Sequence, residues 1–289
     1  MRRKQTVVLK FGSSVLRNEE DLPSVVNEIV RASENGAQVV AVVSAFGDTT
    51  DQLMRQAVKV CPNPEPSALA SLLATGEAAS SALLGLALSR AGIHVCVLDA
   101  VQAGLRTVGE ILNADPIAVD RTRLLTELRR AVVVLPGFVG RNEQGHTTLL
   151  GRGGSDYSAL FIAHQLEARC VLLKDVDGLY TCDPACATVR ASRFAQVSYD
   201  TAIRLGGPVV QQKAVRFASA HQQRFTITSI GALTATEVGP FTDRLDASTG
   251  TGVSPVDHAQ DARATNQTDL LPAEPLRLAF EKELEECVA

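Results

Sequence analysis

Two lysines that end apolar, β-branched runs are the first residues in this sequence that could do chemistry. Lys10 closes the run Thr6–Lys10 and is followed by the turn Gly12-Ser13-Ser14, and Lys174 closes the run Arg169–Lys174. An ammonium group is a compact charge that suits a phosphate, and the N–H groups and hydroxyls of such a turn add hydrogen-bond donors. A solvated lysine at a strand end is the simpler alternative. The combination favours binding of a phosphorylated ligand.

A glycine-rich segment, Gly151-Arg152-Gly153-Gly154-Ser155-Asp156-Tyr157-Ser158, opens a helical pattern that continues to Leu166. Adjacent glycines let the backbone approach a ligand closely. Ser155 can cap the helix, whose free N–H groups then point at the turn and favour an anion. An ordinary glycine-rich turn with a serine cap is the alternative interpretation. The segment follows an apolar run, Val132–Leu135, and a polar hairpin, Arg141–Thr148.

Two further segments carry polar groups that could contact a substrate or a nucleotide. The run Ser67–Ala91 predicts an apolar helix interrupted at Ala74-Thr75-Gly76-Glu77, and such a local break often marks a functional site. Glu77 could hold a substrate ammonium, or it could be a surface glutamate at a helix end. The turn-rich loop Asp175–Pro184 follows a strand-end lysine, and Tyr180 within it could pack on a flat group. A cation, acids and an aromatic together suit a nucleotide.

The pattern of the elements that must position these groups predicts a three-layer α/β fold. Near-continuous apolar strands at Thr6–Lys10 and Gln38–Ser44, joined by a helix from about Asn18 to Gly36, predict a parallel sheet buried on both faces. We expect further strands at residues 94–99, 131–135, 169–174, 225–229 and 236–241. We expect further helices at residues 122–130, 199–205 and 213–222. Ligands bind beyond the carboxyl ends of such strands. The sequence therefore predicts an open, mostly parallel sheet with helices on both faces, and one crevice shared by the turns after residues 10 and 44.

Composition limits the partners and the compartment. The 289 residues are 45% hydrophobic and 21% charged, which is typical of a soluble globular protein, and the net charge of −4 argues against nucleic acid or an anionic membrane. No apolar run is expected to span a membrane, and Met1–Gln5 leads into a strand instead of a signal-peptide core. Cys182 and Cys186 have no second ligand pair, so we predict no resident metal ion. We expect reduced thiols and a cytoplasmic location.

The chain divides by composition near residue 245. Residues 1–245 form the predicted catalytic domain. Residues 246–289 begin with a Ser/Thr/Asp/Gly-rich linker and end with a short acidic segment, Glu274–Val288, that could form an amphipathic helix. We expect this tail to be disordered or docked on a partner.

The ordered set of segments resembles the amino-acid kinase family, and within it the aspartokinases, over about residues 5–245. Neither a Walker A pattern nor GxGxxG is present. The most specific pieces are Leu149–Asp156 and Asp175–Tyr180. Nothing after residue 245 is long enough for the paired ACT domains of many aspartokinases, so feedback inhibition through them is not expected. The segment Leu271–Phe280 is similar to the linker of aspartokinase/homoserine dehydrogenase fusions.

The resemblance implies transfer of the γ-phosphoryl group of ATP to the side-chain carboxylate of L-aspartate, the first step toward lysine, threonine and methionine, with Mg²⁺ carried by the nucleotide. It implies a homodimer and a possible homoserine dehydrogenase partner. The implied catalytic residues are Lys10, Asp156 and Lys174. The implied substrate-binding residues are Ser14, Ser44, Glu77, Arg152, Gly153, Gly154 and Ser155. The implied nucleotide-binding residues are Lys10, Gly12, Ser13, Lys174, Asp175, Tyr180, Asp183 and Lys213.

Three departures from the family pattern leave alternatives open. The first turn has one glycine before Ser13, as in the Lys-x-Gly-Ser-Ser turn of glutamate 5-kinase, which favours glutamate or another small carboxylate as the acceptor. Ala185 stands where the family has arginine, and the segment from Pro208 lacks the family's lysine. These losses favour a catalytically weak, ligand-sensing protein of the same fold, unless Lys174 or Lys213 compensates.

Overall fold

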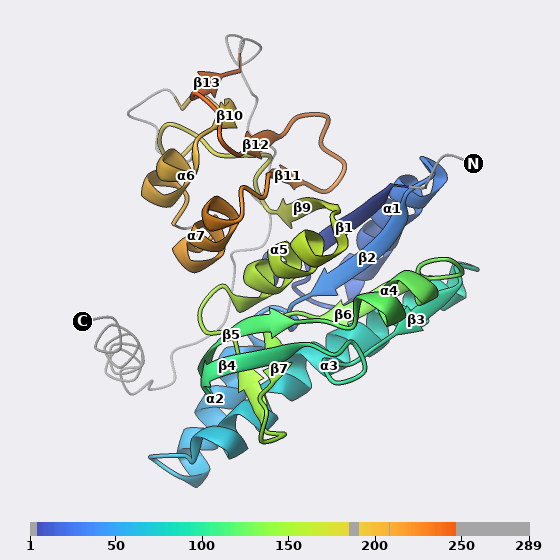
Figure 1. Ribbon diagram of the computed structural model, residues 1–289, viewed down its shortest axis with the longest axis vertical. Coiled ribbons are helices and arrows are strands. Elements are labelled where there is room, and N and C mark those ends of the chain that lie inside the picture. Colours follow the sequence, from blue (N-terminus) through green and yellow to red (C-terminus); the bar gives the residue numbers. More distant parts are fainter. Residues whose placement is uncertain (1–4, 185–190, 208, 247–289) are drawn as a thin grey trace, which may run out of the picture. The chain divides into compact units, whose positions relative to one another are not determined.

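A nine-stranded sheet forms the centre of the computed structural model, which describes residues 5–184, 191–207 and 209–246 (Figure 1). The strand order is β13-β10-β12-β11-β9-β1-β2-β6-β3. The strands are β1 Thr6–Phe11, β2 Gln38–Val43, β3 Val95–Val97, β6 Val132–Pro136, β9 Arg169–Lys174, β10 Phe194–Val197, β11 Phe225–Ser229, β12 Thr236–Val238 and β13 Arg244–Leu245. Neighbouring strands are parallel except in the β11–β12 and β10–β13 pairs. The predicted, mostly parallel sheet is confirmed.

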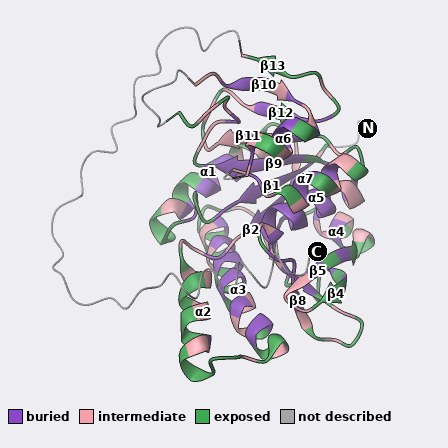
Figure 2. Cartoon of the chain, turned by 90° about the vertical axis from the view of Figure 1, so that its left-hand side faces the viewer, coloured by how far each residue is buried: buried purple, intermediate pink, exposed green. Residues whose placement is uncertain are grey.

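Helices cover both faces of this sheet. They are α1 Leu22–Glu34, α2 Thr49–Val60, α3 Pro66–Arg90, α4 Arg121–Glu127, α5 Gly154–Leu166, α6 Tyr199–Leu205 and α7 Gln212–Ala220, with a short 3₁₀ helix, η1, at Glu19–Asp21. Apolar residues of α1 and α3 share one buried cluster with alternate residues of β1 and β2. Residues of α4, α5, α6 and α7 fill the cluster on the opposite face. The predicted three-layer arrangement is therefore confirmed, and its buried strands are visible in Figure 2.

Strand alternation places both strand-end lysines on the same face of the sheet. Successive side chains of a strand point to opposite faces. Val8, and therefore Lys10, lies on the face covered by α5, and Cys170 and Leu172 place Lys174 on that face as well. Lys10 is paired in register with Leu172 of the adjacent strand. The two ammonium groups therefore approach the start of α5 from neighbouring strands.

A second, four-stranded sheet packs beside the carboxyl edge of the first. It has the order β5-β4-β7-β8, with β4 Arg106–Glu110, β5 Asn113–Ala118, β7 Val139–Arg141 and β8 Thr147–Leu149. The β7–β8 pair confirms the predicted hairpin. β4 and β5 were not predicted, because β4 is mostly exposed and β5 contains Pro116, which weakens a strand pattern. A buried hydrogen bond of 2.7 Å between the Thr107 and Thr148 hydroxyls ties the sheet together.

α3 is continuous through Gly76 and Glu77, so the predicted interruption is wrong. A Cβ on Gly76 would lie 3.0 Å from Ala45 Cβ and 3.3 Å from Thr49 Cγ2. The glycine therefore serves close packing of α3 on the segment after β2 and does not break the helix. α3 also meets the length and hydropathy of a membrane span, contrary to the expectation that no run would. Half of its most apolar window is buried, and core helices meet the same criteria, so this is weak support for a span.

Some predictions fall on residues outside the described ranges. The predicted tail lies there apart from Asp246, and so do Ala185, Cys186 and Pro208.

Candidate active site

A buried carboxylate bridges the two strand-end lysines. Asp156, in the first turn of α5, has Oδ1 2.7 Å from Lys10 Nζ in an ion pair. Its Oδ2 accepts a hydrogen bond of 2.7 Å from Lys174 Nζ. All three residues are at most 8% exposed. Two ammonium groups and one carboxylate leave a formal charge of +1 at the carboxyl edge of the sheet, where an anion is favoured.

Burial and mutual attraction shift the protonation of these groups. Burial lowers the pKa of Lys10 to about 8, because the ammonium loses its water shell; the Asp156 charge opposes this change. Burial alone would raise the pKa of Asp156, but the charges of Lys10 and Lys174 outweigh it and hold that pKa below its usual value. At neutral pH the bridge is therefore charged.

Glu77 of α3 brings a second carboxylate to this region and is only 2% exposed. Its Oε1 accepts the Ala45 N–H at 3.3 Å, while Oε2 has no hydrogen-bond partner among the described residues. Burial raises the pKa of Glu77 to about 7, although the Ala45 hydrogen bond and the Lys10 charge pull it down. A buried carboxylate oxygen without a partner is costly, and a ligand ammonium would satisfy it.

The turns after β1 and β2 are joined by backbone hydrogen bonds. The Ser44 N–H donates to the Phe11 carbonyl at 3.0 Å, and the Gly47 N–H donates to the Leu16 carbonyl at 2.9 Å. A Cβ on Gly12 would lie 2.8 Å from Lys10 Nζ, so this glycine leaves room for the ammonium group. Ser13 and Ser14 are exposed, and Ser44 is half-buried. The structure thus brings together the two turns expected to share a crevice.

The glycine-rich segment forms a left-handed turn before α5. Gly151 and Gly153 have φ of +72° and +71°, which a residue with a Cβ rarely adopts. The helix cap is Gly153, whose carbonyl accepts the Asp156 and Tyr157 N–H groups. The predicted capping role of Ser155 is therefore wrong. Ser155 is buried inside the first turn, because it packs against Gly137.

The loop after β9 carries the residues predicted to bind the nucleotide. Asp175 and Asp183 are exposed, and Tyr180 is half-buried with its hydroxyl donating to Asp177 Oδ1 at 2.7 Å. Asp177 Oδ2 also accepts the Thr234 hydroxyl at 2.6 Å and lies 3.5 Å from Arg193 Nε.

Asp177 and Arg193 were missed by the sequence reasoning. In the sequence, Asp177 is one of several turn-forming residues in the loop Asp175–Pro184 and has no feature that singles it out. Arg193, only 2% exposed, also pairs with Asp246. Only the fold brings these residues together to hold the loop.

Arg152 lies in the glycine-rich turn, and Lys213 lies in the first turn of α7. Arg152 is exposed on the turn between Gly151 and Gly153. The Lys213 ammonium contacts Asn113 and Leu150, next to the glycine-rich turn, instead of the loop after β9.

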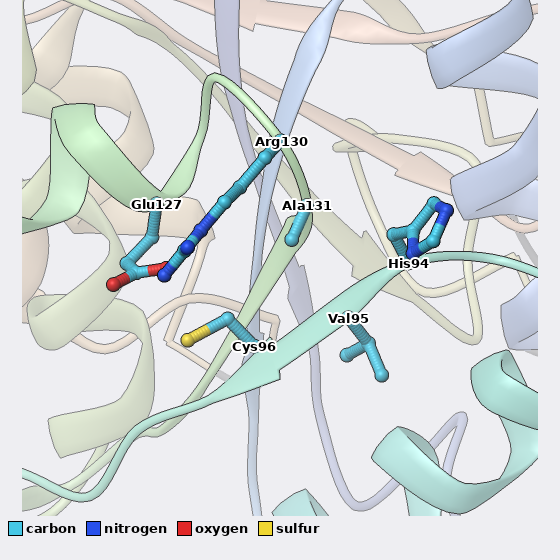
Figure 3. A pocket seen from close by; sticks show the side chains of 6 residues that line it. All are labelled: His94, Val95, Cys96, Glu127, Arg130 and Ala131. Carbon is cyan, nitrogen blue, oxygen red and sulfur yellow. The ribbon is translucent and has the colours of Figure 1, made fainter.

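A cavity of about 460 Å³ lies elsewhere, at the amino ends of β3 and β6 (Figure 3). It is lined by His94, Val95, Cys96, Glu127, Arg130 and Ala131. The Glu127 and Arg130 side chains pair across 2.7 Å, which neutralises both charges. This cavity is at the sheet edge opposite Lys10 and Lys174 and has no part in the candidate site.

The chain thus combines a mostly parallel sheet, covered by helices on both faces, with a lysine–aspartate–lysine bridge at the carboxyl edge of that sheet. The chain belongs to the amino acid kinase family, whose model matches residues 5–229. Its relatives include aspartokinases. It is 36% identical to the aspartokinase of Geobacillus stearothermophilus over 228 residues, which cover 77% of this chain and 56% of that protein. It is 38% identical to the Mycobacterium tuberculosis aspartokinase over 221 residues, 74% of this chain and 52% of the relative.

The solved aspartate kinase from Synechocystis is similar in fold, with a TM-score of 0.72 at 31% identity. The match covers 82% of this chain and 40% of that structure. The chain thus spans about half the length of the relatives that it matches, or less.

Proposed function

We propose that this chain is an aspartate kinase, which transfers the γ-phosphoryl group of ATP to the side-chain carboxylate of L-aspartate. The observation that carries the proposal is the Lys10–Asp156–Lys174 bridge, a buried, net positive group at the carboxyl edge of the sheet. The identity of 36–38% to aspartokinases supports aspartate as the acceptor over glutamate.

The reaction needs positioning and charge neutralisation more than proton transfer. The acceptor carboxylate is ionised at neutral pH, so one of its oxygens attacks the γ-phosphorus without a general base. A new P–O bond forms to that oxygen, the bond from the γ-phosphorus to the bridging oxygen breaks, and its electron pair leaves on ADP. The developing charge is stabilised by fixed cations in a site from which water is largely excluded.

Each buried group has a distinct part in this scheme. Lys10 neutralises the transferring phosphoryl group, and Lys174 neutralises the nucleotide phosphates. Asp156 holds both ammonium groups apart at a fixed separation, which prevents their repulsion from displacing them. The exposed Ser13 and the Gly12 N–H add donors to the phosphate side.

The acceptor amino acid is held by groups of opposite charge. Oε2 of Glu77, which lacks a partner within the part of the chain that the structure describes, receives the substrate ammonium. Arg152 binds the α-carboxylate through its planar guanidinium group. Ser14, Ser44 and Ser155 complete the acceptor side with Gly153 and Gly154. These assignments require an acceptor with both an ammonium and two carboxylates.

The nucleotide enters as its magnesium complex. Mg²⁺ favours phosphate oxygens and water over a protein cage, and the lysine bridge occupies the Asp156 carboxylate. Tyr180, Asp175 and Asp183 form the nucleoside side of the site. We further propose that the protein is a cytoplasmic homodimer. Association with a homoserine dehydrogenase is proposed only from the likeness of residues 271–280 to a fusion linker.

Trapping of the acyl phosphate with hydroxylamine tests the proposal directly. The full chain is incubated with MgATP and either L-aspartate, L-glutamate or N-acetylglutamate, and hydroxamate formation is measured. Aspartate is expected to be the preferred acceptor. Absence of aspartate hydroxamate, with turnover of glutamate, would contradict the acceptor, and absence of turnover with all three would contradict the enzyme.

A further inference from the structure

Lys213, in the first turn of α7, makes its contacts beside the glycine-rich turn. Its Nζ donates to Asn113 Oδ1 at 2.7 Å, to the Ala114 carbonyl at 3.2 Å and to the Leu150 carbonyl at 3.3 Å. An ammonium group has three N–H donors, so these three acceptors use all of them. Asp115 Oδ1, 3.3 Å away, supplies the opposite charge. This set of contacts leaves no donor for a nucleotide phosphate.

The acceptors of Lys213 adjoin Gly151. Leu150 directly precedes this glycine, and Asn113 forms an antiparallel bridge with Leu150. Asn113 Oδ1 lies 2.4 Å from the position of a Cβ on Gly151, so the amide packs against the glycine backbone. Lys213 therefore holds both the residue before the left-handed turn and the side chain behind it.

The residue that caps α7 contacts the other end of the same turn. A Cβ on Gly153 would lie 2.2 Å from Gln211 Cγ, so the glutamine side chain packs directly on this glycine. The start of α7 thus contacts Gly153 directly through Gln211 and reaches Gly151 through Asn113. A further contact, 5.4 Å from Lys213 Nζ to the centre of the Tyr157 ring, joins α7 to the residue after Asp156.

We propose that Lys213, with Gln211 beside it, is a positioning residue for the acceptor site. It holds the Gly151–Gly153 turn in the conformation that presents Arg152 to the carboxylate of an amino-acid acceptor. Lys213 itself does not touch substrate. This inference rests on the proposed function for the role of Arg152, but the clamp on the turn is a property of the protein alone.

Steady-state kinetics of the full chain with Lys213→Met separate this role from nucleotide binding. Methionine keeps much of the side-chain volume and removes the charge and the donors. The KM for aspartate is expected to rise about tenfold to a hundredfold, since small misplacements of a binding group have effects of this size. The KM for MgATP is expected to change by less than about twofold, because the contacts of Lys213 lie beside the glycine-rich turn and not on the loop after β9. A rise in the KM for MgATP, alone or with that for aspartate, or no change in either, would overturn the proposal.

Three further variants make the kinetic result specific. Lys213→Arg restores charge and donors and is expected to recover most of the lost aspartate affinity. Asn113→Ala removes the principal acceptor, leaves Lys213 in place and is expected to raise the KM for aspartate in the same sense. Arg216→Met, on an exposed part of the same helix, is expected to leave both constants unchanged. If Lys213→Met does not fold, Asn113→Ala decides, and an unchanged KM for aspartate in that variant overturns the proposal.

Amide hydrogen exchange tests the clamp without any substrate. Exchange across residues 150–156 is expected to accelerate in Lys213→Met, whereas exchange across β11 is expected to remain as in the wild type. Equal exchange at residues 150–156 in both proteins would overturn the inference. Because this measurement needs no turnover, it remains decisive even if the wild type fails to phosphorylate aspartate, an outcome that counts against the proposed function alone.

Discussion

Lys10 and Asp156 lie in contact, with Nζ 2.7 Å from Oδ1, and both side chains are almost completely buried. One comes from the carboxyl end of β1 and the other from the first turn of α5. Buried ion pairs are retained at a cost of desolvation, and removal of one partner leaves the other charge uncompensated. A substitution in this pair should therefore change both the free energy of unfolding and the charge of the candidate site.

Removal of the Lys10 charge is expected to abolish most of the activity. Lys10→Met should reduce kcat about a hundredfold to a thousandfold, the usual effect of deleting one stabilising group for transition-state charge. Hydroxamate formation under saturating substrates measures this loss. Unchanged kcat in a folded Lys10→Met protein would refute the catalytic assignment.

Removal of the bridging charge is expected to affect stability as well. Asp156→Asn leaves Lys10 and Lys174 without a counter-charge, and loss of one partner of a buried pair costs about 3–5 kcal/mol. Urea unfolding monitored by circular dichroism measures this change in the free energy of unfolding. Asp200→Asn, an exposed carboxylate on α6, serves as the control and should change stability by less than about 0.5 kcal/mol.

The pH dependence of aspartate binding should report Glu77 and Lys10. Ionised Glu77 is the form that attracts an ammonium group, so kcat/KM for aspartate should rise with pH through about 7. It should fall above about 8 as Lys10 loses its proton. Glu77→Gln is expected to lower kcat/KM and to remove the acid limb only. Retention of that limb in the variant would assign it to another group.

Glu77 also predicts a pH-dependent stability. Its pKa in the folded protein, about 7, is above the ordinary glutamate value of 4.5, so the folded state binds more protons between these values. The stability that Glu77 contributes is thus fully present below about pH 4.5 and is lost as pH rises through 7. Glu77→Gln should therefore be more stable than the wild type at pH 8, by about 3 kcal/mol at most. Thermal unfolding at pH 5 and pH 8 measures the difference, with the exposed Glu143→Gln as a control that should show none.

Gly12→Ala is expected to impair catalysis without unfolding the protein. The new Cβ would lie 2.8 Å from Lys10 Nζ, and the flexible end of a lysine side chain can move aside. Because Lys10 is the proposed catalytic group, kcat should fall at least about tenfold while the melting temperature changes little. Gly207→Ala, where no described residue other than its chain neighbours has an atom within 4 Å of the added carbon, should preserve both. A large loss of stability in Gly12→Ala would show that Lys10 cannot move.

Asp177 is expected to act on the nucleotide through Tyr180. Asp177→Asn weakens the acceptor of the Tyr180 and Thr234 hydroxyls and removes the charge facing Arg193. The KM for MgATP should rise about tenfold, since hydrogen bonds to a charged group contribute about 1.5–3 kcal/mol. The KM for aspartate should stay constant. A raised KM for aspartate with an unchanged KM for MgATP would instead place this loop on the acceptor side of the site.

The strands that carry the site could be predicted from local sequence. Valine- and leucine-rich runs such as Val39–Val43 and Val132–Leu135 are buried on both faces, and this burial imposes a continuous apolar pattern. Lysines at the ends of two such runs then mark the carboxyl edge. The small sheet could not be predicted in the same way, because β4 and β5 are short, partly exposed and without a continuous apolar run.

Errors in the predicted site came from residues whose role depends on distant neighbours. The local sequence predicts a helix break at Gly76. In the structure this glycine lies within a continuous helix and packs against Ala45. Ser155 reads as a cap, although the left-handed conformation of Gly153 starts the helix earlier. In both positions, a contact formed only on folding overrides the local preference.

The sequence by itself determined the family, the parallel sheet and the residue types at its carboxyl edge, because strand periodicity and turn chemistry are local properties. Only the tertiary structure decided that Asp156 bridges Lys10 and Lys174, and that Lys213 binds the Leu150 carbonyl beside the glycine-rich turn. It also decided that Glu77 is buried, with one carboxylate oxygen that no described residue pairs with. These relationships depend on strand register and on the packing of α3, α5 and α7 against the sheet edge. Side chains far apart in the chain meet only when those surfaces are assembled.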